Sequence, residues 1–209
     1  NIRSTKAVYD IQFGHAERPT HWNTSWDWAR YEVCGHKWAD LSENGYGVSL
    51  LNDCKYGYSI KDNAVKLSLL KSAVYPDTTA DKGVHEFIYS LYPHIGNVTE
   101  GGTIEAANQL NLPAQVVSGV FTDWRKLVEV SSDCVQIDAV KKAEEEDCLI
   151  VRLHECRGGR RKVTLTSQFD VKRIVPCNLL EHDTGESVEG SKVSFEVTPF
   201  MIKTFKLYL

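Results

Sequence analysis

Residues 193–197 read Val-Ser-Phe-Glu-Val, so apolar and polar side chains alternate along this segment. The same period of two recurs elsewhere, with apolar positions at Val65, Leu67 and Leu69; Phe87, Tyr89 and Leu91; Val135, Ile137 and Ala139; Leu149, Val151 and Leu153; Val163 and Leu165. Successive side chains of a strand point to opposite faces of its sheet, so the alternation predicts half-buried β-strands. The second half of the chain is therefore expected to be one strand after another.

The connections between these segments carry charge or turn-forming residues. Residues 141–147 predict a solvated hairpin tip, residues 157–160 (Arg-Gly-Gly-Arg) predict a glycine-rich turn, and residues 182–192 predict a longer polar loop. Because strands joined by such links are usually antiparallel, we expect sequential strands to pair in that way.

The sequence predicts a single short helix, at Thr103 to Asn111, after a Gly-Gly pair and before Pro113. Many short strands with so little helix predict an all-β protein of packed antiparallel sheets. The first part of the chain is rich in aromatic residues and long loops, whereas the rest is a compact run of strands. We therefore place a domain boundary near residue 117, between residues 1–116 and 117–209.

The overall composition excludes several classes of partner. The chain has 209 residues, of which 42% are hydrophobic and 25% are charged, with a formal net charge of −4. No long basic stripe supports nucleic-acid binding, so no nucleic acid is expected as a partner. Because no apolar run approaches the roughly 20 residues that span a bilayer, no membrane partner is expected either.

The cysteine pattern indicates a cytosolic protein. The chain contains 6 cysteines, all widely spaced, without a Cys-x-x-Cys pair or a Cys/His cluster at zinc-finger spacing. Free buried thiols are the simplest interpretation. The chain starts with Asn1 rather than methionine, and a strand-like segment follows almost at once, so we also expect a fragment of a longer protein.

Four of the 5 tryptophans fall between residues 22 and 38, and three of them lie in the run 20–28. Sugar rings stack their C–H faces on aromatic side chains, while Asn, Asp and His bond the hydroxyl groups, so this run suits carbohydrate contact. Large aromatic residues also close a sandwich core or dock a neighbouring domain. Both interpretations stay open on the sequence alone.

No catalytic residue and no metal site is predicted within the chain. A glycosidase needs two carboxylates across the scissile bond, but 28 acidic residues place some pair close together by chance. The 7 histidines form no His-Glu-x-x-His or comparable ligand pair. Asp81 and His85 lie in a polar loop before Phe87, where a ligand-facing loop or an ordinary solvated loop would sit.

Several segments resemble the C-terminal region of family thirty-eight glycoside hydrolases, closest to the cytosolic-type, fungal vacuolar and bacterial α-mannosidases. The segments span both halves of the chain: 18–30 (RPTHWNTSWDWAR), 45–48 (GYGV), 50–58 (LLNDCKYGY), 85–87 (HEF), 91–94 (LYPH), 178–181 (NLLE) and 199–204 (PFMIKT). The resemblance implies that residues 1–116 are the later strands of a galactose-mutarotase-like supersandwich. It implies that residues 117–209 form a small terminal β-sandwich.

The resemblance also implies an enzyme that hydrolyses terminal α-linked mannose with retention, with a zinc ion and a carboxylate nucleophile. Those groups lie upstream in the family, so the zinc of the full-length enzyme has no counterpart here. The expected partners are the N-terminal catalytic domain of the same enzyme and a mannose-containing oligosaccharide, and a homo-oligomer is left open. The expected location is the cytoplasm, with the vacuole as the alternative.

The family's supersandwich packs against the catalytic domain and lends residues to the rim of the sugar pocket. For that role the resemblance singles out seven residues: His21, Trp22, Asn23, Trp26, Asp27, Asp81 and His85. One alternative is a non-catalytic carbohydrate-binding β-sandwich module, which the tryptophan run suggests. A weaker one is a mutarotase-like epimerase, in which a histidine and a carboxylate transfer protons on a sugar.

Overall fold

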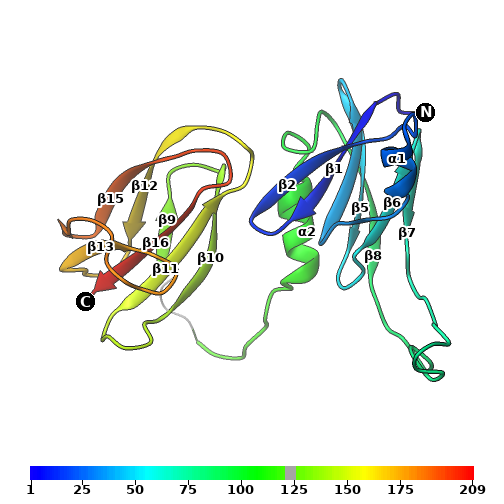
Figure 1. The fold of residues 1–209 in the computed structure, drawn as a ribbon. Coiled ribbons are helices and arrows are strands. Elements are labelled where there is room, and N and C mark those ends of the chain that lie inside the picture. Colours follow the sequence, from blue (N-terminus) through cyan, green and yellow to red (C-terminus); the bar gives the residue numbers. More distant parts are fainter. Residues whose placement is uncertain (121–125) are drawn as a thin grey trace. The chain divides into compact units, whose positions relative to one another are not determined.

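The computed structural model describes residues 1–120 and 126–209. It divides into two compact units, Asn1–Val116 and Val117–Leu209, which are described separately. Strands dominate both units (Figure 1), which confirms the predicted all-β class. No helix in the described part of the chain is long and apolar enough to cross a membrane.

The first unit is built on a five-stranded antiparallel sheet with the order β2-β1-β4-β5-β8. Its strands are β1 (Lys6–Ile11), β2 (Gly14–Pro19), β4 (Trp38–Glu43), β5 (Tyr46–Asn52) and β8 (Tyr89–His94). A second sheet, with the order β3-β6-β7, packs on one face of the first. Its strands are β3 (Val33–Cys34), β6 (Gly57–Lys61) and β7 (Ala64–Leu67).

The core between these two sheets comes from β1, β4 and β6. Its buried members are Ala7, Tyr9, Ala39, Leu41, Tyr58 and Ile60. The opposite face of the large sheet is covered by helix α2 (Thr103–Asn111), which packs against β4 and β5. This helix spans the residues that the sequence predicted, and it buries Thr103, Ile104 and Ala107.

A second helix, α1 (Ser25–Ala29), was not predicted. Its five residues are too few to show helical periodicity. Thr24 just before it and Trp26 and Trp28 within it are residue types that favour strands. The signal that was available is the capping pattern of Thr24 followed three residues later by Asp27, which form a capping box.

Two of the predicted strands are shorter than their alternation suggested. Leu69 lies beyond the end of β7 and Phe87 lies before the start of β8, so both belong to the long connection of residues 68–88. Alternation in the sequence continues there, but no neighbouring strand pairs with these residues in the described part of the chain.

The second unit is a β-sandwich, as predicted. One sheet has the order β10-β11-β16-β13-β14 and the other has the order β15-β12-β9. The strands are β9 (Val128–Val130), β10 (Val135–Lys142), β11 (Leu149–Glu155), β12 (Arg161–Ser167), β13 (Arg173–Cys177), β14 (Val188–Glu189), β15 (Lys192–Val197) and β16 (Ile202–Tyr208). Their inward side chains, including Val151, Leu165 and Phe205, form one core.

The turn at residues 157–160 does not join an antiparallel pair, which corrects the expectation for β11 and β12. Those two strands lie in different sheets. The reason is the fully buried carboxylate of Glu155, which accepts backbone N–H groups from Arg157, Gly158, Gly159 and Phe200 at 2.9–3.0 Å. These hydrogen bonds hold the backbone of residues 157–159 around the Glu155 side chain, and the chain passes from the sheet of β11 to the sheet of β12 at this turn.

All 6 cysteines are free, but only four of them are buried. Cys34 and Cys54 are exposed, which corrects the expectation of buried thiols at these two positions. Both lie near the ends of strands in the first unit, where the polypeptide leaves its sheets.

Candidate functional site

The tryptophan segment, defined here as residues 20–30, is held in place by the cap of helix α1. The Thr24 hydroxyl accepts the amide of Asp27 at 3.2 Å, and the Asp27 carboxylate accepts the amide of Thr24 at 3.0 Å and its hydroxyl at 2.9 Å. These reciprocal bonds satisfy backbone donors that a helix start leaves open. They fix the direction in which the helix projects its side chains.

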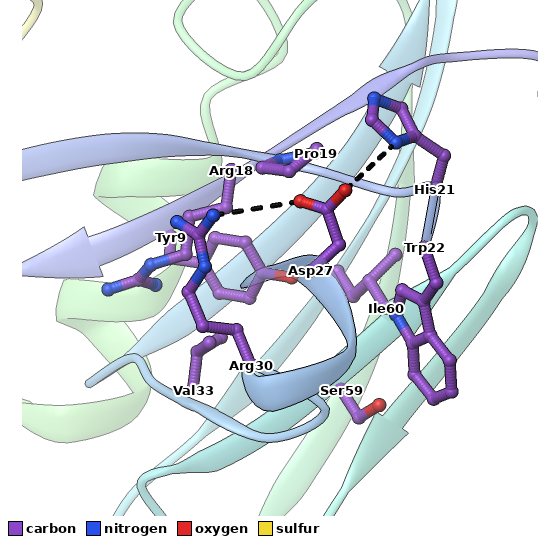
Figure 2. A pocket seen from close by; sticks show the side chains of 10 residues that line it. All are labelled: Tyr9, Arg18, Pro19, His21, Trp22, Asp27, Arg30, Val33, Ser59 and Ile60. Atoms are coloured by element: carbon purple, nitrogen blue, oxygen red, sulfur yellow. Dashed lines mark ion pairs between the residues drawn. The ribbon is translucent and has the colours of Figure 1, made fainter. Parts of the chain in front are cut away.

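Asp27 is the charged centre of this segment, and only 7% of it is exposed. Its carboxylate oxygens lie 3.6 Å from His21 Nδ1 and 3.6 Å from Arg30 Nη2 (Figure 2). Hydrogen bonding from the Thr24 side chain lowers the pKa of the Asp27 carboxyl. Burial by itself would raise this pKa, but the Thr24 amide and the charges of His21 and Arg30 lower it further. Asp27 therefore stays ionised, with its carboxylate already engaged by Thr24.

The indole rings of Trp22 and Trp28 form an aromatic wall beside this centre. Their centroids are 4.9 Å apart at an interplanar angle of 56°. Lys61 Nζ lies 4.2 Å from the Trp22 centroid and 5.6 Å from the Trp28 centroid, within the range of cation–π attraction. Trp28 is 59% exposed and the neighbouring Trp26 is 77% exposed, so both present indole surface to solvent.

The pocket at this segment is narrow. Figure 2 shows its lining, which is Tyr9, Arg18, Pro19, His21, Trp22, Asp27, Arg30, Val33, Ser59 and Ile60. Its cavity volume of about 20 Å³ has room for about one water molecule. A sugar ring therefore does not fit inside this pocket, and a sugar contact at the segment has to use the exposed indoles outside it.

The structure brings some of the seven predicted site residues together and separates others. His21, Trp22 and Asp27 line the pocket, while Asn23 and Trp26 are exposed beside it. Asp81 and His85 lie in the connection 68–88, which extends from the end of β7 away from α1 (Figure 1). There His85 Nε2 lies 2.8 Å from the backbone oxygen of Asp81, so the two residues contact each other rather than the tryptophan segment.

Sequence reasoning missed four residues of this site: Tyr9, Arg18, Arg30 and Lys61. Arg30 could have been found, because it follows Asp27 by three positions on the same helix end. Arg18 lies with its guanidinium 4.7 Å from the Tyr9 ring centroid, and this contact joins two strands. Burial raises the pKa of Tyr9 to about 12, against the opposing charge of Arg18, so the phenol stays protonated at neutral pH.

Trp38, the fourth member of the tryptophan cluster, belongs to the core. It is 2% exposed and starts β4. The two interpretations of the cluster therefore apply to different residues, with Trp38 packed inside the unit and Trp26 and Trp28 on its surface.

A histidine–carboxylate pair also exists in the first unit, but it is enclosed. His94 Nε2 lies 2.7 Å from Asp40 Oδ2, and the two side chains are 2% and 0% exposed. A Cβ atom at Gly47 would lie 2.3 Å from the His94 ring, and one at Gly101 would lie 2.2 Å from it, so two glycines clamp the imidazole. Ser49 donates a further hydrogen bond to Asp40. Because both side chains are buried, the pair stabilises the sheet and is not accessible to a sugar.

Metal ligands do not gather in the described residues. No group of three His, Cys, Asp or Glu side chains there is arranged to hold a metal ion. The side chains of residues 1–120 and 126–209 therefore do not form a tetrahedral zinc site.

The two units match the two C-terminal domains of one glycosidase family. Residues 1–79 match the "Glycosyl hydrolases family 38 C-terminal domain", and residues 134–205 match the "Glycosyl hydrolases family 38 C-terminal beta sandwich domain". The chain therefore belongs to the C-terminal region of glycosyl hydrolase family 38.

Within this family, the chain is similar to proteins named as α-mannosidases. It is 43% identical to α-mannosidase G of Dictyostelium discoideum over 98% of the chain, and 41% identical to human α-mannosidase 2C1 over 100% of the chain. It is 36% identical to an α-mannosidase of Saccharomyces cerevisiae, again over 100% of the chain. The chain spans about a fifth of the length of these relatives, from 20% to 22%.

A solved structure has the same fold. The crystal structure of an α-mannosidase from Enterococcus faecalis superposes with a TM-score of 0.79 at 16% sequence identity, over 98% of this chain and 24% of that one. At this identity the likeness establishes the fold, while family membership rests on the domain matches.

Proposed function

We propose that this chain is the C-terminal β region of an α-mannosidase that hydrolyses terminal α-linked mannose from oligosaccharides. In this proposal the chain supports a catalytic domain in the preceding part of the enzyme. The observation that carries it is the identity of 41–43% to proteins named as α-mannosidases, maintained over 98–100% of the chain.

The metal chemistry belongs to the rest of the enzyme in this proposal. Zinc would grip the sugar hydroxyls there, and a carboxylate of that domain would act as nucleophile. The chain's own contribution is positional, through a rigid sheet system and the capped helix α1.

The tryptophan segment is the part of this chain that we assign to the rim of the sugar site. The pocket is too narrow to hold a sugar ring, so the available contact is stacking of the sugar on exposed indole rings. Trp26 and Trp28 provide these rings. Asn23 and Lys61 lie beside the indoles and supply groups that bond hydroxyls. Asp81 and His85 remain candidates for a separate loop contact, because the connection 68–88 is exposed.

Activity measurements on the longer enzyme test this proposal. We expect it to hydrolyse an aryl α-mannoside, to lose activity to a chelator and to regain activity with Zn²⁺, whereas residues 1–209 alone are inactive. Turnover by the isolated chain contradicts the proposal that catalysis belongs to the preceding domain. A longer enzyme without mannosidase activity contradicts the proposed function.

The exposed indoles also favour a second candidate, a carbohydrate-binding module without catalysis. Titration of residues 1–209 with mannose oligosaccharides, followed by tryptophan fluorescence, separates the two. Saturable binding that Trp26→Ala abolishes and Tyr31→Ala preserves supports the module. Tyr31 is the matched control, because it is exposed to 62% and lies outside the candidate residues.

We also propose a cytoplasmic location, for which the free state of the 6 cysteines is the support, since reduced thiols are typical of that compartment. The vacuolar alternative predicts that the protein copurifies with vacuoles. Fractionation of cells that express the longer enzyme distinguishes the two locations.

A further inference from the structure

Two cysteines face each other at the end of the β10–β11 pair in the second unit. The register pairs Val135 with Glu155, so the preceding Cys134 lies opposite the following Cys156. The Cys156 amide donates to the Cys134 carbonyl at 2.8 Å, which continues the ladder by one pair. Neither thiol is in a disulfide, and both residues are buried, with 2% of Cys134 and 5% of Cys156 exposed.

The backbone geometry of this pair suits a disulfide. Opposed residues that share a ladder hydrogen bond in an antiparallel pair have Cα atoms about 5.5 Å apart, within the range of about 4.4–6.8 Å that disulfides span. Their side chains leave the sheet on the same face. Cys156 Sγ lies 3.3 Å from the Cys134 carbonyl oxygen, so this sulfur is already directed toward the opposite residue. Bond formation therefore requires rotation of side chains rather than movement of strands.

The other two buried cysteines do not share this arrangement. Cys148 precedes Leu149, which pairs with β16 at Leu207. Cys177 pairs with Thr204 from the other side of the same strand. Two strand spacings, about 9–10 Å, therefore separate Cys148 from Cys177, which exceeds the limit of about 7 Å for a disulfide. Burial also raises the pKa of both thiols, to about 11 for Cys177, so this pair serves as a control.

The opposed cysteines adjoin the turn that connects β11 to β12. The Glu155 carboxylate accepts the amides of residues 157–159. Arg157 in the same turn forms an ion pair with Asp133 at 2.9 Å. Each of the two cysteines directly follows one of these carboxylate residues in the sequence. A bond between the two sulfur atoms would therefore join the two points that anchor the turn.

We propose that Cys134 and Cys156 form an oxidation site, which a hydroperoxide converts to a disulfide that locks the turn at residues 157–159. In the first step one cysteine, as its thiolate, attacks the oxygen–oxygen bond and becomes a sulfenic acid. The departing oxygen takes up the proton and leaves as water or an alcohol. In the second step the sulfur of the other cysteine attacks the sulfenic acid, a sulfur–sulfur bond forms, and water leaves with the thiol proton. The two thiols lose two electrons, which the hydroperoxide accepts.

The bond is expected to form only when hydroperoxide accumulates, because cytosolic reductants keep thiols reduced. Gly158, two positions after Cys156, is exposed, so opening of this turn admits a molecule as small as hydrogen peroxide. None of these residues belongs to the tryptophan segment. The inference therefore goes beyond the proposed function and is tested separately from it.

Peptide mapping after oxidation tests the connectivity. The 209-residue chain is treated with hydrogen peroxide, alkylated in denaturant and digested without reductant. The link between Cys134 and Cys156 is expected to be at least about tenfold more abundant than one between Cys148 and Cys177. Oxidation in urea is the second control, because unfolding removes the register and with it the preference. Equal abundance of the two links in the folded chain, or sulfinic acid at Cys134 and Cys156 without a link, overturns the proposal.

Single substitutions test the two chemical steps. In Cys156→Ser the second step is blocked, so a sulfenic acid is expected to persist at Cys134 and to react with a dimedone probe. Cys134→Ser is expected to leave the same label at Cys156. The parent chain, in which the second thiol removes the sulfenic acid, should be labelled at least about fivefold less. Equal labelling of the parent chain and both variants contradicts the proposal.

Hydrogen–deuterium exchange tests the lock. In the oxidised chain the amides of Gly158 and Gly159 are expected to exchange at least about threefold more slowly than in the reduced chain, because the cross-link restricts opening of the turn. Amides of the first unit are the control and should not change. A cross-linked chain in which Gly158 and Gly159 exchange at the rate of the reduced chain refutes the lock. None of these results bears on mannosidase activity.

Discussion

Replacing Glu155 with glutamine tests the physical account of the second unit most directly. The Glu155 Oε1 atom accepts the amides of Arg157 and Gly159, and Oε2 accepts those of Gly158 and Phe200. Glutamine keeps one acceptor oxygen and places an NH₂ group in the position of the other. Two backbone N–H groups therefore lose their acceptor in a site that is closed around a side chain of 0% exposure.

The expected cost follows from those two lost bonds. An unsatisfied buried donor costs about 1–3 kcal/mol, so two of them cost about 2–6 kcal/mol. Because Gly158 lies at an exposed position, water compensates in part, and we expect about 3 kcal/mol. In a unit of this size, that loss corresponds to a fall in melting temperature of about 10 °C or more.

Differential scanning calorimetry of the chain measures this change. The matched control is Glu145→Gln, which removes the same charge from an exposed position and is expected to alter the unfolding free energy by less than about 0.5 kcal/mol. If Glu155→Gln melts within about 3 °C of the control, the carboxylate does not hold the turn, and the argument for the change of sheet is wrong.

The remaining predictions concern titration and thiol reactivity. The folded-state pKa of Asp27 lies below its ordinary value, so its carboxylate stabilises the fold at neutral pH, and this contribution is lost as the pH falls below about 4. Urea midpoints at pH 7 and pH 3 should therefore differ less in Asp27→Asn than in the parent chain, and an equal difference contradicts the cap. With a chromogenic disulfide reagent at pH 8, Cys34 is expected to react first and Cys54 more slowly, because a hydrogen bond with Asp53 raises the pKa of the Cys54 thiol. Rapid reaction of Cys177, whose pKa burial raises to about 11, contradicts the packing of the second unit.

Much of the fold could be predicted because strands and α2 carry local signals. Alternation identified strands β7, β8, β10, β11, β12 and β15, whereas β2, β4 and β5 were not predicted from it. The glycine pair with Pro113 bounded the helix at Thr103–Asn111. The change of sheet after β11 had no local signal, because it depends on Glu155 reaching Phe200, which is 45 positions further along the chain. A buried glutamate and an exposed one look alike in a sequence.

The candidate site divides along the same line. His21, Trp22 and Asp27 could be grouped because one short segment contains them. Lys61 could not be predicted as a member of the site, because it reaches the indoles from the β6–β7 hairpin. The separation of Asp81 and His85 from the tryptophan segment could not be predicted either. The role of these residues at a sugar site stays a prediction, which the oligosaccharide titration addresses.

The clamp of His94 between Gly47 and Gly101 has a consequence for how these positions vary among relatives. The imidazole occupies the space into which either Cβ atom would extend, at 2.3 Å and 2.2 Å. A methyl group at position 101 is therefore tolerated only together with a smaller side chain at position 94. Gly101→Ala should be rescued only in part by His94→Ala in a double-mutant cycle, because the Cβ atom of residue 94 stays 2.8 Å from the added methyl group, so positions 94 and 101 are expected to change as a correlated pair across evolution.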